Sequence, residues 1–202
     1  MPIKKELLPV LRGKKVLLRP LAFEAHRESV LKWLNDPDIL VNLEDDIPLK
    51  KRGLKRWFSE NSTRNEEFSL GDKRLGFAIE VLETGVFIGY MIIHTINWTD
   101  RTAFTTSVIG EPEYRRGGYG TDAKMTLLNY ALNILKLRKL YAVINAYNEA
   151  SIRYNERCGY WRVATFPDKV VRSGKIWDEV WISVSLETWS HIWDKYQKTG
   201  EI

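Results

Sequence analysis

The sequence has few cysteines, few histidines and no long apolar run, and each of these features excludes a class of protein. With a single cysteine, Cys158, an internal disulfide is ruled out and a reducing compartment is expected. The three histidines and Cys158 lack the spacing of metal ligands, so no metal site is expected. The longest apolar run, residues 86–93, falls far short of the roughly 20 residues that cross a membrane. Since the first residues also lack the apolar core of a signal peptide, we expect a soluble, cytoplasmic protein without a membrane partner.

The remaining composition is that of an ordinary globular protein. The 202 residues are 44% hydrophobic and 28% charged, and a chain of this length is typical of a single domain, 1–202. The net charge of +5 favours an anionic partner, and nucleic acid, an acidic protein or a phosphorylated cofactor would each suit it. The basic residues are scattered, however, and the cluster at residues 50–56 is typical of a solvated helix face.

The hydrophobic pattern predicts a mixed α/β (α+β) fold. Alternating and continuous apolar runs indicate strands, and apolar residues at helical spacing indicate helices. Three strands follow one another as a meander, which is not the pattern of a doubly wound fold. We expect a twisted, mostly antiparallel mixed sheet of about seven strands flanked by helices. The expected strands are residues 14–18, 75–82, 86–96, 103–109, 139–146, 160–166 and 177–186, and the expected helices are residues 22–34, 49–59, 121–135, 150–158 and 187–198.

The last expected helix carries an apolar stripe. Its members fall at helical spacing on one face, and they are Trp189, Ile192, Trp193 and Tyr196. A stripe of this kind usually packs against the protein's own sheet. The alternative is a contact between two copies of the chain in a homodimer, and both interpretations stay open at this point.

A glycine-rich loop between an apolar strand and a long helix is the sharpest local feature. It reads Arg-Arg-Gly-Gly-Tyr-Gly-Thr over residues 115–121. Its three glycines let the backbone approach a bulky anion, and the N–H groups at the start of the following helix point toward it. Arg115 and Arg116 add charge-assisted donors for phosphate. An ordinary strand-to-helix turn also uses glycine, but this context and the two arginines favour an anion site.

Two other phosphate-binding patterns do not fit the loop. A Walker A motif requires a lysine directly after its last glycine, and Gly120 is followed by threonine. A dinucleotide fingerprint is matched by Gly118, Gly120 and Ala123, but it also needs an acidic residue at the end of the next strand. Residues 140–145 contain no such residue, so both patterns are rejected.

The loop resembles that of the GCN5-related N-acetyltransferases, the GNAT superfamily. Arg115, Gly118 and Gly120 match the family's Q/R-x-x-G-x-G/A pattern. The flanking residues 111–114 and 121–123 are similar to those of its RimJ/RimL-like branch, which acetylates ribosomal proteins.

A second motif downstream strengthens the resemblance. Asn148 and Ser151, followed by Glu156, Gly159 and Tyr160, resemble the N-x-x-S…E-K-x-G-F/Y segment of that branch. Shorter matches occur at residues 19–21 and 35–37, so that the resemblance spans about residues 16–186 and leaves a C-terminal helix at about 187–198. The implied fold is the GNAT fold in one N-acetyltransferase domain.

The resemblance implies acetyl-CoA as co-substrate. In the family the glycine loop holds the pyrophosphate of coenzyme A, and the strand before it pairs through its backbone with the pantetheine arm. Asn148 would hydrogen-bond that arm, cap the helix that follows it, or do both. The residues implied to bind the cofactor are Val108, Ile109, Gly110, Arg115, Arg116, Gly117, Gly118, Tyr119, Gly120, Thr121 and Asn148.

The resemblance also points to two catalytic positions that this sequence fills unusually. Many members carry a tyrosine four residues before the glycine that ends the second motif, and here that position is Asn155. Tyr154 is its neighbour, and on a helix the two side chains point about 100° apart. Many members also carry a glutamate in the strand before the loop, where our alignment has Phe104. The candidate catalytic residues are therefore Asn155 and, if the register differs by one, Tyr154.

No general base follows from the sequence. The candidates are Glu80, His94 and the acidic residues 44–46. His94 lies in an expected strand, where a histidine is typically a packed and hydrogen-bonded core residue. Residues 44–46 form an expected loop that in this family walls the acceptor cleft, where they could attract a cationic amine. Cys158 has no motif of a nucleophile around it and is expected at a packed helix end.

These observations predict an acetyltransferase that moves the acetyl group of acetyl-CoA to an amine by direct attack in a ternary complex. The acceptor is a protein N-terminal α-amine or a small primary amine. The alternative is a non-catalytic module that binds acyl-CoA or nucleic acid. Eight tryptophans and the basic balance suit nucleic acid, but the sequence lacks the interleaved aromatic and basic residues of RNA-binding motifs.

Overall fold

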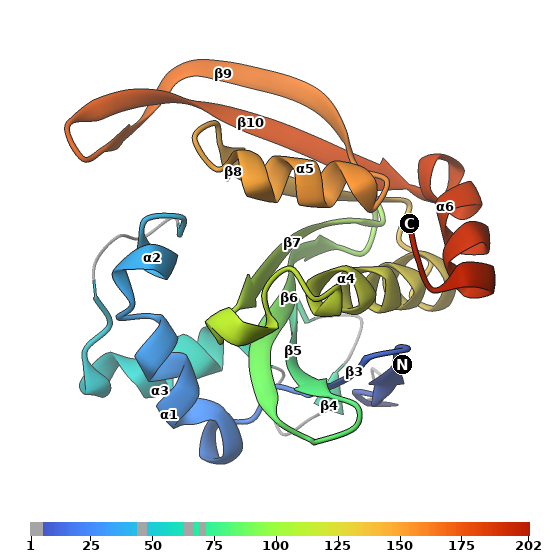
Figure 1. Ribbon diagram of the computed structural model, residues 1–202, viewed down its shortest axis with the longest axis horizontal. Helices are drawn as coiled ribbons and strands as arrows, with labels where there is room; N and C mark the ends of the chain where they lie inside the picture. The colour runs from blue at the N-terminus through green and yellow to red at the C-terminus, as the bar shows by residue number, and fades with distance from the viewer. Residues whose placement is uncertain (1–5, 44–47, 63–66, 69–71) are drawn as a thin grey trace.

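The computed structural model describes residues 6–43, 48–62, 67–68 and 72–202. In these residues an eight-stranded mixed sheet has the order β2-β3-β5-β6-β7-β8-β10-β9, with helices on both faces (Figure 1). Its strands are β2 (Leu11–Arg12), β3 (Val16–Pro20), β5 (Arg74–Val81), β6 (Phe87–Asn97), β7 (Thr102–Ile109), β8 (Lys139–Asn145), β9 (Trp161–Arg172) and β10 (Lys175–Ser185). A separate two-stranded sheet pairs β1 (Glu6–Leu7) with β4 (Glu67–Phe68).

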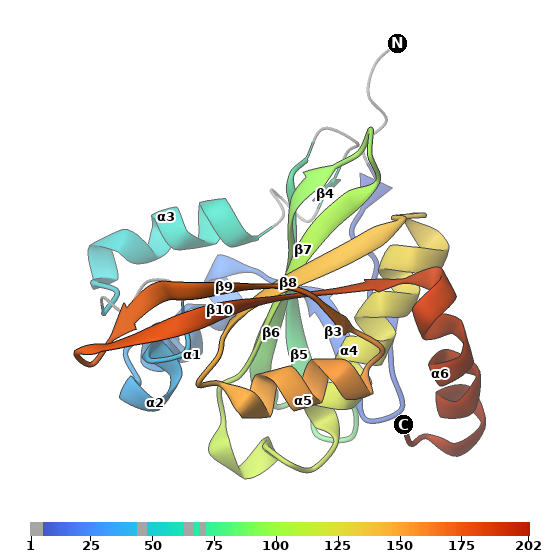
Figure 2. The ribbon, with the colours of Figure 1, turned by 90° about the horizontal axis from the view of Figure 1, so that it is seen from above.

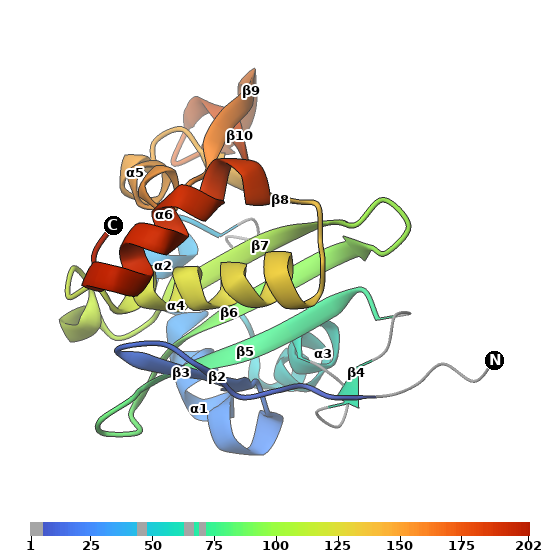
Figure 3. The same cartoon turned by 90° about the vertical axis from the view of Figure 1, so that its right-hand side faces the viewer.

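Helices cover both faces of the central strands. Three of them, α1 (Phe23–Trp33), α2 (Pro37–Leu40) and α3 (Lys51–Asn61), lie on one side of β5 to β7, and α4 (Tyr119–Asn129) lies on the other (Figure 3). A 3-10 turn, η2 (Pro112–Tyr114), precedes α4, and a π-helical segment, η3 (Tyr130–Ile134), continues it. The remaining helices are α5 (Glu149–Arg157) and α6 (Leu186–Thr199).

Alternating side chains divide the core into two clusters, one on each face of the sheet. Phe77 and Ile79 of β5 pack with α4, whereas Ala78 between them packs with α1 and α3. This is the period of two that a strand imposes. On β7 the same alternation turns Ile109 toward α4 and Val108 toward α1 and α3.

The central sheet opens between β7 and β8. These two strands form a parallel pair at only three positions, the last of which joins Phe104 to Tyr141. Beyond that point β8 continues beside β10, while residues 105–109 of β7 keep only β6 as a partner among the described strands. The second half of β7 therefore presents an unpaired backbone edge.

The hairpin of β9 and β10 is longer than the sequence pattern predicts. The expected strands ended at residue 166 and began again at 177, but the hairpin continues to a turn at Ser173 and Gly174, whose φ angles are 50° and 73°. Pro167 and the polar residues after it are not typical of a strand, so the sequence pattern does not predict this extension. An edge strand such as β9 nevertheless tolerates a proline. The far end of the hairpin projects over the side of the molecule where α2 lies (Figure 2).

The expected order of elements is confirmed, with local corrections. The sheet has eight strands rather than about seven because the short β2 adds an edge. The helix expected at 121–135 begins earlier, at Tyr119, and its last turns are π-helical. The helix expected at 22–34 is α1, which ends at Trp33, and Asp36 then caps the short α2, with Pro37 at its first position. No helix in the described part of the chain is long and apolar enough to span a membrane.

Candidate functional site: the open edge of β7 and the start of α4

The C-terminal end of β7 is fixed against α1. Gly110 packs so closely on Trp33 that a Cβ atom there would lie 2.0 Å from its indole ring. The next residue, Glu111, accepts hydrogen bonds from Trp33 Nε1 at 3.0 Å and from Lys32 Nζ at 2.8 and 2.9 Å. The hydrogen bond from Lys32 is the main reason why the pKa of Glu111 lies below its ordinary value. These contacts set the point at which the chain leaves the sheet.

Gly118 makes the turn from the loop into α4. It is the residue before the first helical position and has φ +82°, a conformation that suits glycine and strains other residues. The helix start therefore exposes backbone N–H groups without a side chain at Gly118 to cover them. Because the positive end of the helix dipole adds to these donors, the position suits an anion.

Asp122 holds this helix start against the turn between β2 and β3. Its carboxylate is buried and accepts hydrogen bonds from the backbone N–H groups of Lys14, Lys15 and Val16 at 2.7–2.9 Å. The hydroxyl of Tyr196 on α6 also donates to it. Three distant segments thus meet at Asp122, although the sequence analysis assigned it no role.

The two arginines of the loop differ in what they do. The guanidinium of Arg115 donates to the carbonyl oxygens of Ile109 at 3.1 Å and Gly110 at 3.2 Å, so it ties the loop back onto the end of β7. Its expected role as a phosphate donor stays a prediction. Arg116 is exposed and has a positive φ of 63°. Lys15, which the sequence analysis left out, reaches the same loop and donates to the carbonyl of Gly117 at 3.0 Å.

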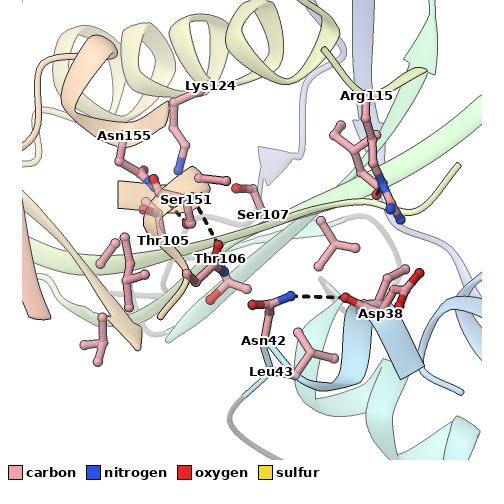
Figure 4. Close-up of a pocket in the computed structure, with 18 residues that line it drawn as sticks. Asp38, Asn42, Leu43, Thr105, Thr106, Ser107, Arg115, Lys124, Ser151 and Asn155 are labelled. Atoms are coloured by element: carbon pink, nitrogen blue, oxygen red, sulfur yellow. Dashed lines mark hydrogen bonds between the residues drawn. The ribbon is translucent and has the colours of Figure 1, made fainter. Parts of the chain in front are cut away.

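A cavity of about 370 Å³ lies along the open edge of β7. Figure 4 shows its walls, which come from β7, β8, α2, α4 and α5. The side chains of Thr105 and Ser107 belong to the α4 side of β7, and those of Thr106 and Val108 to the α1 side, so the cavity spans both faces of the sheet at this edge. Of the residues predicted to bind the cofactor, four line it directly: Val108, Ile109, Arg115 and Asn148.

The two adjacent candidate catalytic residues point in different directions. Asn155 is buried and lines the cavity, as Figure 4 shows. Tyr154 instead donates its hydroxyl to the carbonyl of Gly120 at 2.8 Å and packs against the core. Burial raises the pKa of Tyr154 well above its ordinary value, so its proton is firmly held. The geometry favours Asn155 as the residue that faces a bound molecule.

Asn155 has an incomplete set of hydrogen bonds. Its Nδ2 donates to the carbonyl of Ser151 at 2.9 Å, one turn earlier on α5. Its Oδ1 is buried and has no hydrogen-bond partner among the described residues. A buried amide oxygen of this kind is costly to leave unpaired, which is typical of a position that meets a ligand.

Asn148 caps α5, as one of its two expected roles requires. Its Oδ1 accepts a hydrogen bond from the backbone N–H of Ser151 at 3.1 Å. The residue also lines the cavity, so its second expected role, contact with a bound arm, stays a prediction.

The expected bases occupy different surroundings. His94 Nδ1 and Nε2 each lie 3.1 Å from a threonine hydroxyl, on Thr95 and Thr106, which confirms a hydrogen-bonded histidine. Burial, followed by the charge of Arg74, lowers the pKa of His94 to about 4 and keeps the ring neutral at neutral pH. Thr106 lines the cavity and so connects His94 to it.

Of the other expected bases, Glu80 does not line the cavity. Glu80 pairs with Arg19 at 2.7 Å. Phe104, at the position of the family glutamate, packs among aromatic rings. Residues 44–46 lie outside the described part of the chain. Cys158 is buried at the end of α5, as expected, and burial raises the pKa of its thiol to about 12.

The wall opposite α4 comes from α2 and the residues after it. Asp38 and Asn42 line the cavity there, with Asn42 Nδ2 donating to the carbonyl of Asp38 at 3.1 Å (Figure 4). Long-range contacts hold the segment. Tyr147 donates its hydroxyl to the carbonyl of Val41, and Arg172 on β9 donates to that of Leu43 at 2.9 Å. No local motif indicates these contacts, so the sequence analysis missed them.

Lys124 is the second residue that the sequence analysis missed. It lies on α4 in a stretch that reads as core, yet it lines the cavity beside Asn155 (Figure 4). The only available signal was a lysine in the middle of an otherwise apolar helix, Ala123 to Leu128.

Comparison with known proteins settles the family. A model of the acetyltransferase (GNAT) domain matches residues 15–160. The chain belongs to the GNAT acetyltransferase family. The human alpha/beta-tubulin-N-acetyltransferase 9 is a relative in sequence, 25% identical over 188 residues, which make up 91% of this chain and 86% of that protein.

Solved structures show the same GNAT fold. A GCN5-related N-acetyltransferase from Brucella melitensis has a TM-score of 0.77 at 22% identity, covering 98% of this chain and 87% of that one. The spermidine N-acetyltransferase from Vibrio cholerae, solved in complex with CoA and spermine, has a TM-score of 0.75 at 18% identity, covering 87% of this chain and 98% of that one.

The geometry fits acetyl-CoA, the co-substrate of GNAT acetyltransferases. The unpaired edge at residues 105–109 offers backbone groups to an extended chain of amides such as pantetheine. The start of α4 at Gly118, beside the ammonium group of Lys15, offers N–H groups to a phosphate. In the described residues, no group of three or more His, Cys, Asp or Glu side chains is arranged to hold a metal ion.

Proposed function

We propose that this protein transfers the acetyl group of acetyl-CoA to a primary amine. The observation that carries the proposal is the unpaired edge of β7, which is followed, after the loop of residues 110–117, by the Gly118-capped start of α4. A ligand that combines an amide-rich arm with a pyrophosphate matches this arrangement in order and in chemistry.

In this proposal each part of the ligand has its own residues. Val108, Ile109 and Gly110 pair through their backbones with the pantetheine arm, and Asn148 contacts it from the opposite wall. The loop binds the pyrophosphate through backbone N–H groups, for which the residues are Arg115, Arg116, Gly117, Gly118, Tyr119, Gly120 and Thr121. Since Arg115 holds the loop to β7, its contribution is chiefly to position those groups.

The thioester supplies an acyl carbon that a neutral amine can attack directly. The amine must lose a proton, so a base or a water relay assists. His94 is neutral and lies within hydrogen-bond distance of Thr106, which lines the cavity, but its pKa of about 4 makes it a weak base, so the proton passes to water. Asn155 faces the cavity and its amide can hydrogen-bond the departing sulfur, but it cannot give up a proton at neutral pH.

The acceptor is a protein N-terminal α-amine or a small primary amine. Asp38 lines the cavity on the α2 side and supplies a negative charge for a cationic amine before it is deprotonated. The human relative acts on tubulin by its name, and a structural neighbour was solved with spermine, so both acceptor classes have a precedent. The motifs around the loop support the RimJ/RimL-like branch and with it the protein acceptor.

The test combines binding with turnover. Calorimetry should show that acetyl-CoA binds the full chain. A panel of N-terminal peptides and small amines, including spermidine and spermine, should then release free thiol from acetyl-CoA with one acceptor class strongly preferred. Binding of acetyl-CoA without thiol release would indicate a non-catalytic acyl-CoA module. Binding of RNA or DNA in a salt-dependent manner, without any binding of acetyl-CoA, would overturn the proposal.

A further inference from the structure

Lys124 is a buried cation, and no residue in the described part of the chain supplies its counter-charge. Its side chain is 1% exposed, and among the described residues it has neither an acidic partner nor a hydrogen-bond acceptor. Its ammonium group instead lies 5.5 Å from the ring centre of Tyr154 and 5.3 Å from that of Tyr160. Fully buried lysines are rare unless they are paired, because a bare charge is costly to remove from water. Keeping a charged group at this position therefore lowers the stability of the folded protein.

The neighbours of Lys124 do not neutralise it. Burial raises the pKa of the nearby Cys158 thiol to about 12, so this group is uncharged at neutral pH. Burial is also the main cause that lowers the pKa of Lys124 itself, to about 8. At neutral pH the amine therefore carries its proton but holds it more weakly than an ordinary lysine does.

The position of Lys124 corresponds to the leaving-group side of the proposed reaction. It lies on the helix whose first turn forms the candidate phosphate site, and it shares the cavity wall with Thr105 and Ser107 on the α4 side of β7. Asp38, the candidate amine contact, belongs to α2 on the opposite wall. Figure 4 shows the amino group of Lys124 directed into the cavity beside Asn155, whose buried Oδ1 has no hydrogen-bond partner in the described part of the chain.

We propose that Lys124 is the general acid of this enzyme and protonates the coenzyme A sulfur as it leaves. This inference rests on the proposed acetyl transfer. The amine nitrogen forms a bond to the acyl carbon, the carbon–sulfur bond breaks, and its electron pair goes to sulfur, which takes a proton from Lys124 Nζ. The nitrogen's own surplus proton passes to water, and Lys124 regains a proton from water. The products are an amide and a free thiol, with no change in oxidation state.

The pKa of Lys124 is similar to that of the thiol that it would protonate. An ordinary thiol has a pKa of about 8.5, and an acid of similar strength transfers a proton to the thiolate with little cost in either direction. Lys124 would thus perform the task for which Asn155 has no proton to give. The activity should fall as the pH rises above about 8, since Lys124 then loses its proton. The wild-type rate should therefore pass through a maximum rather than rise steadily toward the pKa of the substrate amine.

Two variants separate the charge of Lys124 from its acidity. Lys124→Met keeps the length of the side chain without charge, and Lys124→Arg keeps the charge but cannot release a proton near neutral pH. Lys195→Met, on the exposed side of α6, is the control. The first readout is independent of turnover: the thiol of CoA bound to each protein is titrated by its ultraviolet thiolate absorbance.

We expect the bound thiol pKa to lie about one unit below that of free CoA in the wild type and in Lys124→Arg, and to return to the free value in Lys124→Met. We expect kcat to fall about 100-fold in Lys124→Met, and the decline above pH 8 to vanish in both variants. If Lys124→Met does not fold, the pH profiles of Lys124→Arg and of the wild type decide whether Lys124 is the general acid. A wild-type rate that shows no decline above pH 8 overturns the inference.

The outcomes also separate this inference from the proposed function. A wild-type chain that binds acetyl-CoA and releases thiol, while Lys124→Met keeps an unchanged thiol pKa and at least half of its kcat, would contradict the role of Lys124 alone. A wild-type chain that binds neither CoA nor acetyl-CoA would contradict both.

Discussion

The loop that starts α4 and the wall that α2 forms across the cavity from it are built in different ways. The loop takes its shape from its own motif, in which Gly118 turns the chain and Arg115 ties it to the end of β7, and the distant β2–β3 turn then anchors it through Lys15 and Asp122. The α2 wall depends on residues more than a hundred positions away, such as Tyr147 and Arg172, which hold the carbonyls of Val41 and Leu43.

This difference corresponds to what the two regions are proposed to bind. A co-substrate that is the same in every member of a family can be recognised by one local motif, which a single sequence displays. An acceptor that varies among members is recognised by a wall assembled from distant segments. The predictions below test whether the two regions are as separate in function as they are in construction.

The largest expected effect is on the stability of the fold, and it concerns Asp122 in the first turn of α4. Asp122→Ala should lower the free energy of unfolding by about 3 kcal/mol, since it leaves three backbone N–H groups of the β2–β3 turn without their acceptor. Urea denaturation should show a lower midpoint with an unchanged slope. Asp194→Ala, exposed on α6, is the control. Equal midpoints for the two variants would mean that Asp122 does not anchor the helix start.

The next effect is on cofactor binding. Gly118→Val should weaken acetyl-CoA binding at least tenfold, which is about 1.4 kcal/mol, because a side chain there strains a backbone with φ +82° and covers the start of α4. Gly85→Val is a matched control, with a similar φ of 70° in the β5–β6 turn and open space around it. Calorimetry on both folded variants makes the comparison. Unchanged affinity in Gly118→Val would remove the loop from the site.

The third effect separates two neighbours on α5. Asn155→Ala should lower kcat about tenfold, in line with the loss of a hydrogen bond to a charged group, whereas Tyr154→Phe should keep most of the activity. Tyr154 donates to Gly120 and packs against the core, and it is not one of the residues that line the cavity, so its loss affects packing more than chemistry. The measurement is kcat for both variants at two pH values. The reverse result would mean that Tyr154 turns toward the thioester when acetyl-CoA binds.

The smallest effect is on the α2 wall. Asp38→Asn should raise KM for a cationic amine about threefold, since it removes a charge that attracts the acceptor without touching the reacting atoms. The KM for acetyl-CoA should stay unchanged, and added salt should reduce the difference between the variant and the wild type. A change in KM for acetyl-CoA of the same size would show that the two walls are not separate in function.

The sequence is informative about this molecule wherever the signal is local. The order of strands and helices, the glycine loop and the cap at Asn148 follow from hydrophobic period, glycine placement and helix-start chemistry. The direction of Asn155 follows from helical geometry once the end of α5 is known. The family resemblance adds the co-substrate, which no pattern of charge or spacing could have named.

What the sequence does not display depends on tertiary contacts. Lys124 stands in a stretch that reads as core, but only the packing of α4 against β7 and α5 shows that its amine is buried beside the cavity. Asp122 looks like an ordinary acidic residue of a first helical turn until the β2–β3 turn is brought against it. The stripe of α6 could face either the core or a second copy. In the structure Trp189 and Tyr196 are buried in the chain's own core, and a homodimer stays a prediction.

The most direct test of the account is amide hydrogen exchange along β7, with and without CoA. If pantetheine adds to the strand edge, the amides of residues 105–110 that face the opening should exchange more slowly when CoA is bound, together with those at the start of α4. Residues 102–104, which already pair with β8, should not change. Protection confined to the hairpin of β9 and β10, with no change along residues 105–110, would show that CoA binds elsewhere and would contradict the account.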